Sequence, residues 1–478
     1  MGKPQKVSFG WIIFLIAVVV RLLPVIAARE MTIGLDDMFQ YDMLARSLAA
    51  GDGFRWYSEE DLDLVERYLP VEFIKGNYDP RGVLTSFRAP GYPFFLSLIY
   101  RLFGLEDRFF NARLIQAVVM ATIAPMTWLL GRRLFPEKET IARGAAWFVT
   151  LYPYLLIYPL ALATEAIFIP LVLGCILIVL KAAETRRWVD YLLAGVLLGY
   201  AALTRSVVLA LLPFILLWVW FLVKDRRGTL ILLVSVLVFV VPWTVRNTRL
   251  HGSFTSVENN MGYTLYMGYH PDTEGKFQYP QSLDLMHYLD DGERNRVGME
   301  SAIGFIREDP GRVPYLMLRK LGYFFGLERK ALTYFYSNDF LGYIPQPWLG
   351  LIFAIFLTPF ALLMIFSVPG LISLKWTPPR ILIGVVLLVY FGPHLVLLAE
   401  PRFHLTIVPL LAVFAVYAWT ERKQIVAGML QPGKRWQLAL TAVLVGLLLF
   451  NWGAELYLDA ATLKTLMGPE GNQMYLNY

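Results

Sequence analysis

Two adjacent carboxylates, Asp36 and Asp37, follow the first apolar segment of the chain, where the backbone is expected to leave a membrane. The segment 11–28 is almost wholly apolar, and Lys3 and Lys6 precede it. Because positively charged residues favour the cytoplasmic side, the sequence predicts that both carboxylates face the outside. Carboxylates held at a membrane surface serve base catalysis, metal binding or ion coupling.

The spacing of Asp37 and Tyr41 adds a specific chemistry. Residues four apart share one face of a helix, and an ionised carboxylate there could take a proton from an acceptor hydroxyl. The structural alternative is that Asp36 caps a helix beginning at Met38 and that Asp37 favours its N-terminal dipole. Capping and catalysis are compatible, and both predict a helix at this point.

Further charged residues are expected at the same membrane face. The connections 161–165, 204–206 and 399–403 are so short that their charges must lie at membrane depth. Charged groups at that depth are costly and are therefore functional candidates. The candidates are Asp36, Asp37, Arg88, Glu165, Arg205, Arg246, Glu400 and Arg402.

Each candidate also has a structural interpretation. Glu165 could simply occupy the first turn of a helix, and Arg246 could be an interfacial anchor. His394, Leu398 and Arg402 recur at helical spacing, so His394 could face the same cavity, although a lone intramembrane histidine is more often structural. The convergence of several arginines and acidic residues on one face favours a functional site.

Composition sets the class of protein. The chain of 478 residues is 57% hydrophobic and 17% charged, against roughly 25% charged in a soluble protein, and its mean hydropathy is +0.53. These values predict a polytopic helical membrane protein. Cys175 is the only cysteine, which excludes an intrachain disulfide and a cysteine-based metal site. The basic residues lie in short loops, so nucleic acid is not an expected partner.

The apolar pattern predicts about 11 transmembrane helices, with a range of 10–13, because a span needs about 20 apolar residues. Basic residues concentrate in alternate loops, which places the N-terminus in the cytoplasm and the first span as a signal anchor. The predicted location is the cytoplasmic membrane, with the active site on the outer face. The predicted spans are 10–28, 111–131, 141–160, 163–181, 188–204, 206–223, 229–245, 347–373, 380–398, 403–420 and 436–456.

Two long segments, 29–110 and 246–346, are expected outside the membrane, the second being rich in aromatic residues. Without repeats or low-complexity linkers, residues 1–456 are predicted to form one integrated transmembrane domain, followed by a short outer tail, 457–478. Amphipathic helices at the outer face are predicted within the two long segments. They cover residues 38–48, 58–68, 94–103, 291–309 and 311–330.

Several short motifs occur in order between residues 10 and 420. They include Asp37-x-x-x-Tyr41, Arg88-Ala-Pro-Gly-Tyr92-Pro, Thr164-Glu165-Ala-Ile-Phe168, Leu203-Thr-Arg205, Pro242-Trp-Thr-Val-Arg246-Asn and Glu400-Pro-Arg402-Phe403. This ordered set resembles the GT-C glycosyltransferases, in the branch that contains the protein O-mannosyltransferases and the lipid A aminoarabinose transferases. The resemblance implies an all-α GT-C type bundle.

The resemblance also implies an activity. A sugar would move from a polyprenyl-phosphate donor to a lipid, glycan or protein acceptor at the outer face, with inversion at the anomeric carbon. Asp37, with Asp36 as the alternate, would be the general base, and Glu165 the second acidic residue. Arg88 and Arg246 would hold the lipid phosphate. The chain lacks an evident inserted carbohydrate-binding domain, which distinguishes it from the protein mannosyltransferases.

The remaining candidates complete the predicted site. Arg205 and Arg402 join the phosphate-binding set, and the substrate cavity would contain Tyr41, Tyr92, Glu400 and His394. Membrane lipids are expected partners, and no cofactor is expected to be obligatory. A divalent cation at the paired carboxylates is compatible with the sequence. The main alternative is a transporter or lipid-linked sugar flippase, which the absence of internal repeats and the one-sided charges disfavour.

Overall fold

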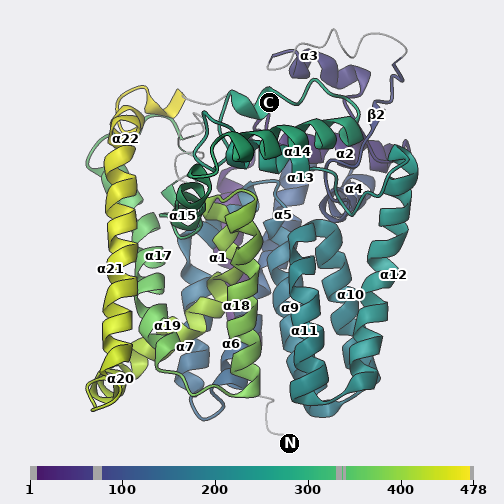
Figure 1. Cartoon of the computed structure of the whole chain (residues 1–478). Coiled ribbons are helices and arrows are strands. Elements are labelled where there is room, and N and C mark those ends of the chain that lie inside the picture. The colour runs from purple at the N-terminus through teal and green to yellow at the C-terminus, as the bar shows by residue number, and fades with distance from the viewer. Residues whose placement is uncertain (1–7, 68–77, 330–335, 337–340, 474–478) are drawn as a thin grey trace, which may run out of the picture.

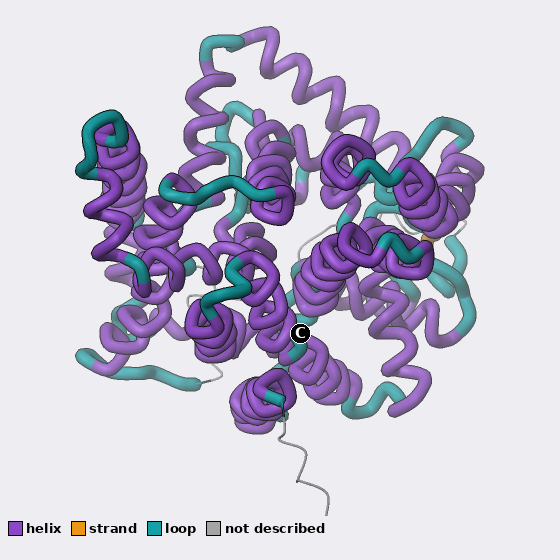
Figure 2. Tube along the Cα trace, turned by 90° about the horizontal axis from the view of Figure 1, so that it is seen from below, coloured by secondary structure: helices purple, strands orange, loops and turns teal. Residues whose placement is uncertain are grey.

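Long helices run roughly side by side, and shorter helices lie across one end of the bundle (Figure 1). The computed structural model describes residues 8–67, 78–329, 336 and 341–473. The N-terminus lies at the end opposite the crossing helices α2, α13 and α14 (Figure 1). Seen from below, many helices are viewed close to end-on (Figure 2). The predicted all-α class is confirmed.

Nine helices or helical runs of the described chain are long and apolar enough to cross a membrane. A tenth apolar helix, α10 (Trp188–Thr204), is shorter. The nine contain α1 (Phe9–Ala27), α5 (Arg108–Ala121) with α6 (Ile123–Leu134), α9 (Glu165–Thr185), α11 (Leu212–Leu217), α12 (Arg226–His251), α17 (Trp348–Ile372), α18 (Pro378–Val396), α19 (Val408–Thr420) and α21 (Arg435–Leu458).

The other elements are short and mostly lie near the bundle ends. They are α2 (Asp37–Ala50), α3 (Leu62–Val65), α4 (Gly91–Phe103), α7 (Glu139–Leu151), α8 (Pro153–Ile157), α13 (Met261–Tyr269), α14 (Asp291–Glu308), α15 (Arg312–Phe324), α20 (Arg422–Met429) and α22 (Ala460–Leu466). Strand β1 (Arg55–Trp56) pairs antiparallel with β2 (Val83–Leu84). Short 3-10 helices precede α11 at Ser206–Leu211 and α19 at Pro401–Ile407.

The helices match the predicted spans closely, with one correction. Residues 141–160 are not one continuous helix, because α7 ends at Leu151 and α8 begins at Pro153. Proline disfavours the helical conformation in the residue before it, and Tyr152 is extended at φ −67° and ψ 113°. Tertiary packing compensates for the break, since this region still belongs to the main apolar core.

The helices predicted outside the spans are also largely present. Helices α2, α4 and α14 coincide closely with three of the five predicted segments. The predicted helix 311–330 is shorter, because α15 ends at Phe324, and residue 330 lies outside the described residues. The predicted charged helix 58–68 is shorter: a 3-10 turn at Glu59–Asp61 leads into α3, which ends at Val65, and residue 68 lies outside the described residues. Helix α13 and the β1–β2 pair were not predicted.

The start of α2 is fixed by its cap. The Asp36 carboxylate accepts a hydrogen bond from the backbone N–H of Met38 at 2.9 Å, as expected of an N-cap aspartate. Gly51 ends the helix with a φ of 90°, a conformation that glycine adopts without steric penalty. Phe39 and Leu44 of this helix are fully buried in a core cluster shared with α4. Asp37 is thereby held in the first turn of a packed helix.

A glycine allows α4 to begin directly against the end of α10. A Cβ atom at Gly91 would lie 2.7 Å from Oγ1 of Thr204 and 2.9 Å from the carbonyl oxygen of Leu203. The Tyr200 hydroxyl donates to the Gly91 carbonyl at 2.9 Å. This close approach brings the segment before α4 and the residue after α10 to one end of the bundle. Arg88 and Arg205 occupy those two places.

Candidate active site

Asp37 lies between two arginines from distant parts of the chain. One carboxylate oxygen accepts from the guanidinium of Arg88, 51 residues away, and the other accepts from Nη2 of Arg402, 365 residues away, at 2.7 Å. Arg88 also donates through Nε to Gln40 at 2.8 Å. The Asp37 side chain keeps 23% of its surface exposed. The structure thus brings together three residues that the sequence nominated separately.

The two adjacent aspartates differ in their electrostatics. Burial raises the pKa of the Asp37 carboxyl, but Arg88 and Arg402 outweigh it and hold that pKa well below its usual range. Desolvation and the charge of Asp37 raise the pKa of Asp36 instead. Asp37 is therefore held in the ionised form, and the exposed Asp36 caps the helix.

Glu165, the first residue of α9, forms a second buried pair. Its Oε1 accepts from the Arg205 guanidinium, and its Oε2 accepts from Oγ1 of Thr164 at 3.1 Å. Burial lowers the pKa of Arg205, but the charge of Glu165 outweighs it and raises that pKa. The guanidinium also lies over the ring of Phe403, 4.8 Å from its centroid. Arg205 is thus a permanent cation at this end of the bundle.

Arg402 connects the two ion pairs. It hydrogen-bonds to Asp37, and its charge also acts on Glu165. Three arginines, Arg88, Arg205 and Arg402, thus lie at this site in ion pairs with Asp37 and Glu165. Guanidiniums held in place in this way suit a phosphate group.

The predicted cavity residues Tyr41 and Tyr92 lie beside the Asp37 pair. Their rings pack edge to face with centroids 5.1 Å apart, and the Arg88 guanidinium lies 5.5 Å from the Tyr41 ring centroid. Burial raises the pKa of Tyr41 to about 12, so its hydroxyl stays protonated at neutral pH. The Tyr92 hydroxyl donates to Gln116 at 2.5 Å.

His394 and Glu400 take different positions. The His394 ring stacks on Phe403 at 4.7 Å, the same ring that lies under Arg205, and within the described residues its Nε2 has no hydrogen-bond partner. Glu400 accepts from the backbone N–H of Phe277 at 3.0 Å. It also lines a small pocket together with Lys276 and Arg329.

Arg246, predicted to hold phosphate, points to the backbone of the first outer segment. Its Nη1 donates to the Thr85 carbonyl at 2.6 Å, and its guanidinium lies 4.9 Å from the Trp243 ring centroid. The interfacial-anchor interpretation beside an aromatic ring therefore describes its contacts well. Arg246 acts on the segment that carries Arg88.

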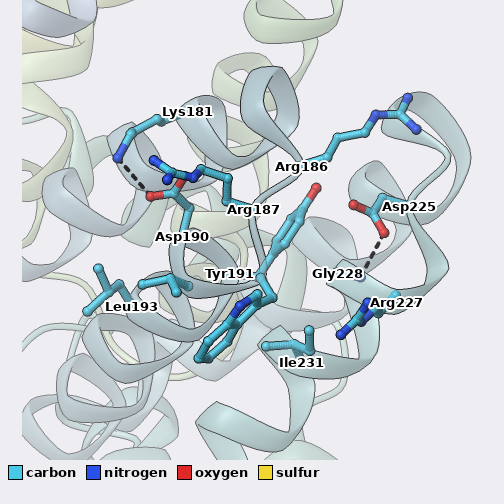
Figure 3. Close-up of a pocket in the computed structure, with 12 residues that line it drawn as sticks. Lys181, Arg186, Arg187, Asp190, Tyr191, Leu193, Asp225, Arg227, Gly228 and Ile231 are labelled. Carbon is cyan, nitrogen blue, oxygen red and sulfur yellow. Dashed lines mark hydrogen bonds and ion pairs between the residues drawn. The ribbon is translucent and has the colours of Figure 1, made fainter.

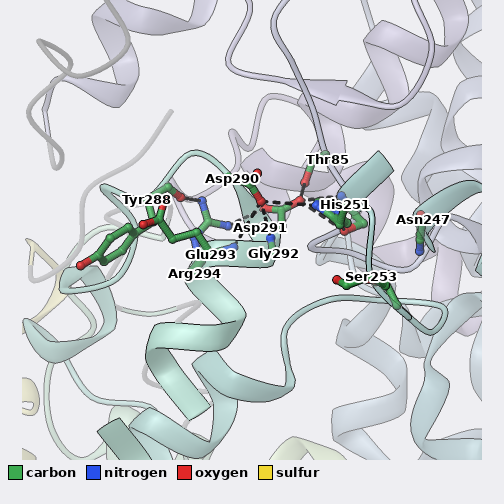
Figure 4. Close-up of polar contacts among 12 residues, drawn as sticks. Thr85, Asn247, His251, Ser253, Tyr288, Asp290, Asp291, Gly292, Glu293 and Arg294 are labelled. Carbon is green, nitrogen blue, oxygen red and sulfur yellow. Dashed lines mark hydrogen bonds and ion pairs between the residues drawn. The ribbon is translucent and has the colours of Figure 1, made fainter. Parts of the chain in front are cut away.

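A buried network around Asp291 holds the same segment at Thr85 and Ser86 (Figure 4). One oxygen of Asp291 accepts from Oγ1 of Thr85 and from the N–H of Ser86, both at 2.6 Å. The other oxygen accepts from Nη1 of Arg294 at 2.7 Å. The Ser86 hydroxyl lies 2.7 Å from Nε2 of His251. Because Arg88 follows two residues later, this network positions it.

Sequence reasoning missed the residues that hold the site in place. Gln40 lies three residues after Asp37 on α2, so helical spacing alone could have nominated it. Asp291 lies 206 residues from Thr85, and its sequence context suggests only a helix start. The Glu328–His404 pair, joined at 3.0 Å and almost fully buried, likewise depends on tertiary contact alone.

The side chains around Asp37 could hold a metal ion only if enough of them were free to act as ligands. Within the residues that the structure describes, no group of three or more His, Cys, Asp or Glu side chains is arranged to hold a metal ion. Both Asp37 oxygens accept from guanidiniums, which a cation would have to displace. These residues do not fit a metal in this arrangement.

Comparison with known proteins places this geometry in context. Residues 87–245 match the family model described as dolichyl-phosphate-mannose-protein mannosyltransferase. No match was found among curated proteins. The matched residues contain Arg88, Glu165 and Arg205.

Solved structures share the fold at low sequence identity. The Archaeoglobus fulgidus oligosaccharyltransferase, tethered with an acceptor peptide containing the NVT sequon, gives a TM-score of 0.52 at 13% identity, over 99% of this chain and 56% of that chain. The same enzyme in complex with Zn and sulfate gives 0.50 at 14% identity, over 98% and 59%. ArnT from Cupriavidus metallidurans, bound to undecaprenyl phosphate, gives 0.38 at 15% identity, over 89% and 82%.

This chain spans less than two thirds of the length of the archaeal enzyme, and at such identities the likeness concerns the fold. The likeness in fold extends over nearly the whole chain, whereas the family match is confined to residues 87–245. The chain therefore shares the fold of the archaeal oligosaccharyltransferase, and residues 87–245 are similar to the dolichyl-phosphate-mannose-protein mannosyltransferase family.

Proposed function

We propose that this protein transfers a sugar from a polyprenyl-phosphate donor to a hydroxyl of a lipid, glycan or protein acceptor. The observation that carries the proposal is Asp37, which is ionised and held between Arg88 and Arg402. The Asp37 carboxylate suits removal of a proton, and the guanidiniums of Arg88 and Arg402 suit binding of a phosphate. The matched family, whose description names a dolichyl-phosphate sugar, supports the donor class.

The proposed reaction is a single displacement. The acceptor oxygen forms a bond to the anomeric carbon while the bond from that carbon to the phosphate oxygen breaks. The acceptor proton passes to the Asp37 carboxylate, and the lipid phosphate leaves with the electron pair. One base suffices, no enzyme nucleophile is needed, and the anomeric configuration inverts.

Arg88 and Arg402 couple donor binding to the base. In the free protein both guanidiniums bond to Asp37 and lower the pKa of its carboxyl, so Asp37 is a weak base. A donor phosphate would share these guanidiniums and weaken their hold on Asp37. The pKa of Asp37 would then rise, which makes the carboxylate a better base once the donor is bound.

The other charged residues support this pair. Glu165 orients Arg205 through their ion pair, and its charge acts on Arg402. Arg205 completes the cationic side of the phosphate site. The contacts of Arg246 support a positioning role through Thr85, in place of the direct phosphate contact that the sequence predicted.

The proposed membrane orientation follows the charges. The site lies at the end of the bundle opposite the N-terminus (Figure 1). At the other end, the last turn of α6 carries Arg132 and Arg133, and the α9–α10 turn carries Arg186 and Arg187. Basic residues next to the spans favour the cytoplasmic side. The site would therefore face outward, where a lipid carrier replaces a soluble nucleotide sugar.

The experiment is a transfer assay with the full chain in nanodiscs. Extracted polyprenyl-phosphate sugars and a mixed acceptor extract are supplied, and products are identified by mass. A mass gain of one sugar on an acceptor, with inverted configuration, is the expected result. Absence of product from every donor, together with protein-dependent movement of lipid or solute across liposomes, would overturn the proposal in favour of a transporter.

A further inference from the structure

A second candidate site lies at the end of the bundle opposite α2, where α12 begins (Figure 1). It is a pocket of about 460 Å³ between the α9–α10 turn and the start of α12 (Figure 3). Helix α9, whose first residue is Glu165, spans 21 residues, so the pocket lies about 30 Å from the active site at 1.5 Å per residue. The two sites therefore face opposite surfaces of the membrane.

The acidic residues of the pocket already have partners. Asp190 accepts from Nζ of Lys181 at 2.8 Å and from Oγ1 of Thr185 at 2.7 Å. Asp225 caps α12 by accepting from the N–H of Gly228 at 2.8 Å. Both carboxylates therefore bond to groups of the protein itself.

Two basic residues of the pocket are not used in this way. Arg187 and Arg227 are exposed, and neither forms an ion pair of 4 Å or less with any residue in the described part of the chain. Arg186 donates a hydrogen bond from Nη2 to the carbonyl oxygen of Val223 at 3.0 Å. The charge of Arg187 acts on Asp190, but neither Arg187 nor Arg227 forms an ion pair within the described part of the chain, so both guanidiniums suit an anion and above all a phosphate.

The rim of the pocket is apolar. Trp188 is 55% exposed, and Val189 and Leu193 are 41% and 43% exposed. Tryptophan concentrates where a membrane meets water, and exposed aliphatic side chains on a spanning helix face lipid chains. A soluble anion would make no use of this rim, whereas a lipid would occupy both the rim and the cationic interior.

We propose that this pocket binds the phosphate headgroup of an anionic glycerophospholipid in the leaflet opposite the active site. Arg187 and Arg227 would contact the phosphate, while Trp188 and Leu193 would pack on the glycerol and the acyl chains. Basic pockets between spanning helices are typical binding sites for anionic lipid headgroups. The volume also falls in the range of small-molecule sites, roughly 300–1,000 Å³.

The test is a lipid titration followed by native mass spectrometry of the full chain in detergent. Phosphatidylglycerol is the probe, with phosphatidylcholine and glycerol 3-phosphate as comparisons. The test variant is Arg187→Gln/Arg227→Gln. The matched control is Arg422→Gln/Lys423→Gln, which removes the same charge from exposed residues of α20 outside the pocket.

The test variant is expected to bind phosphatidylglycerol about 25-fold more weakly, because each basic residue near a membrane surface contributes roughly fivefold. The control and Arg187→Lys/Arg227→Lys should stay within about fivefold of the wild type. Equal binding by the wild type and the test variant would overturn the proposal, as would equal binding of phosphatidylcholine. Displacement of the lipid by equimolar glycerol 3-phosphate would assign the pocket to a soluble phosphate and refute the lipid.

Discussion

Two carboxylates, Asp37 and Asp291, contact the same short segment of chain, residues 85–88, and they differ in partners and in exposure. Asp37 accepts from two guanidiniums, whereas Asp291 accepts from one guanidinium, a hydroxyl and a backbone N–H. The Asp37 side chain is 23% exposed and that of its partner Arg402 is 40% exposed. The Asp291 and Arg294 side chains are both 0% exposed.

The difference in exposure distinguishes an ion pair that only stabilises the fold from one that a substrate can reach. A fully buried ion pair with all its donors and acceptors satisfied cannot reach a substrate, and breaking it leaves a buried charge unpaired. A partly exposed pair can exchange one partner for a ligand. The Asp291 cluster therefore fixes the position of Arg88, and the Asp37 cluster is available for chemistry.

Asp291→Ala is expected to have the largest effect, and mainly on stability. Removing the carboxylate leaves Arg294 buried and unpaired, which lowers the free energy of unfolding by about 3–5 kcal/mol. Denaturant unfolding in detergent measures this. Glu293→Ala, an exposed neighbour, should change stability by less than about 0.5 kcal/mol. An Asp291→Ala protein as stable as the wild type would remove the distinction between the two clusters.

Arg402→Gln is expected to affect activity more than stability. It removes one phosphate donor and one partner of Asp37, so kcat/KM should fall about 100-fold, with partial rescue by Arg402→Lys. Steady-state transfer kinetics and unfolding are measured together. The exposed Arg422→Gln serves as the control and should stay within twofold. A large loss of stability with normal kinetics would make the Asp37 cluster structural.

The pH dependence of transfer tests the coupling between the donor and Asp37. In the free protein the pKa of the Asp37 carboxyl is depressed, so kcat/KM for the donor should stay flat from pH 8 down to about 5. In the donor-bound protein that pKa rises, so the acid limb of kcat should lie at least about one pH unit higher. Coincident acid limbs would contradict the release of Asp37 by the donor.

Thr85→Val tests the positioning of Arg88 by a smaller change. It removes the hydroxyl that donates to Asp291 at 2.6 Å, and a lost hydrogen bond of this kind lowers stability by about 1 kcal/mol. Transfer should fall about threefold and the KM for the donor should rise. Thr441→Val, whose hydroxyl bonds within α21, should change neither the KM nor kcat.

Removal of divalent cations should have the smallest effect. Because both Asp37 oxygens already accept from guanidiniums, transfer in excess EDTA should stay within about twofold of the untreated value. A loss that added Mg²⁺ or Mn²⁺ restores would show that a cation replaces an arginine at the carboxylate.

The sequence predicts the fold well because membrane helices are specified by local patterns. Runs of apolar residues and basic loops identify the spans without tertiary information, and the cap at Asp36 and the start of α14 at Asp291 follow local rules. The break at Tyr152–Pro153 could also have been inferred from the proline. These features depend on neighbouring residues.

The site is less predictable because its contacts are long-range. Membrane depth nominated Arg402, and topology and the ordered motifs nominated Asp37 and Arg88, yet the pairing of residues 365 apart required the structure. The different contacts of Arg246 and Glu400 depend on how the outer segments fold back over the bundle. The sequence identifies the charged residues that lie at one membrane face, and tertiary packing determines which of them contact one another.

The most direct test compares Asp37→Asn with Asp36→Asn, measuring donor binding and sugar transfer on the same nanodisc sample. Asp37→Asn should lower transfer by about 10³-fold, within the range for loss of a general base, while donor binding and the unfolding temperature are retained. Asp36→Asn should retain most of the transfer activity. Transfer at the wild-type rate by both variants would contradict the role of Asp37 as the catalytic base.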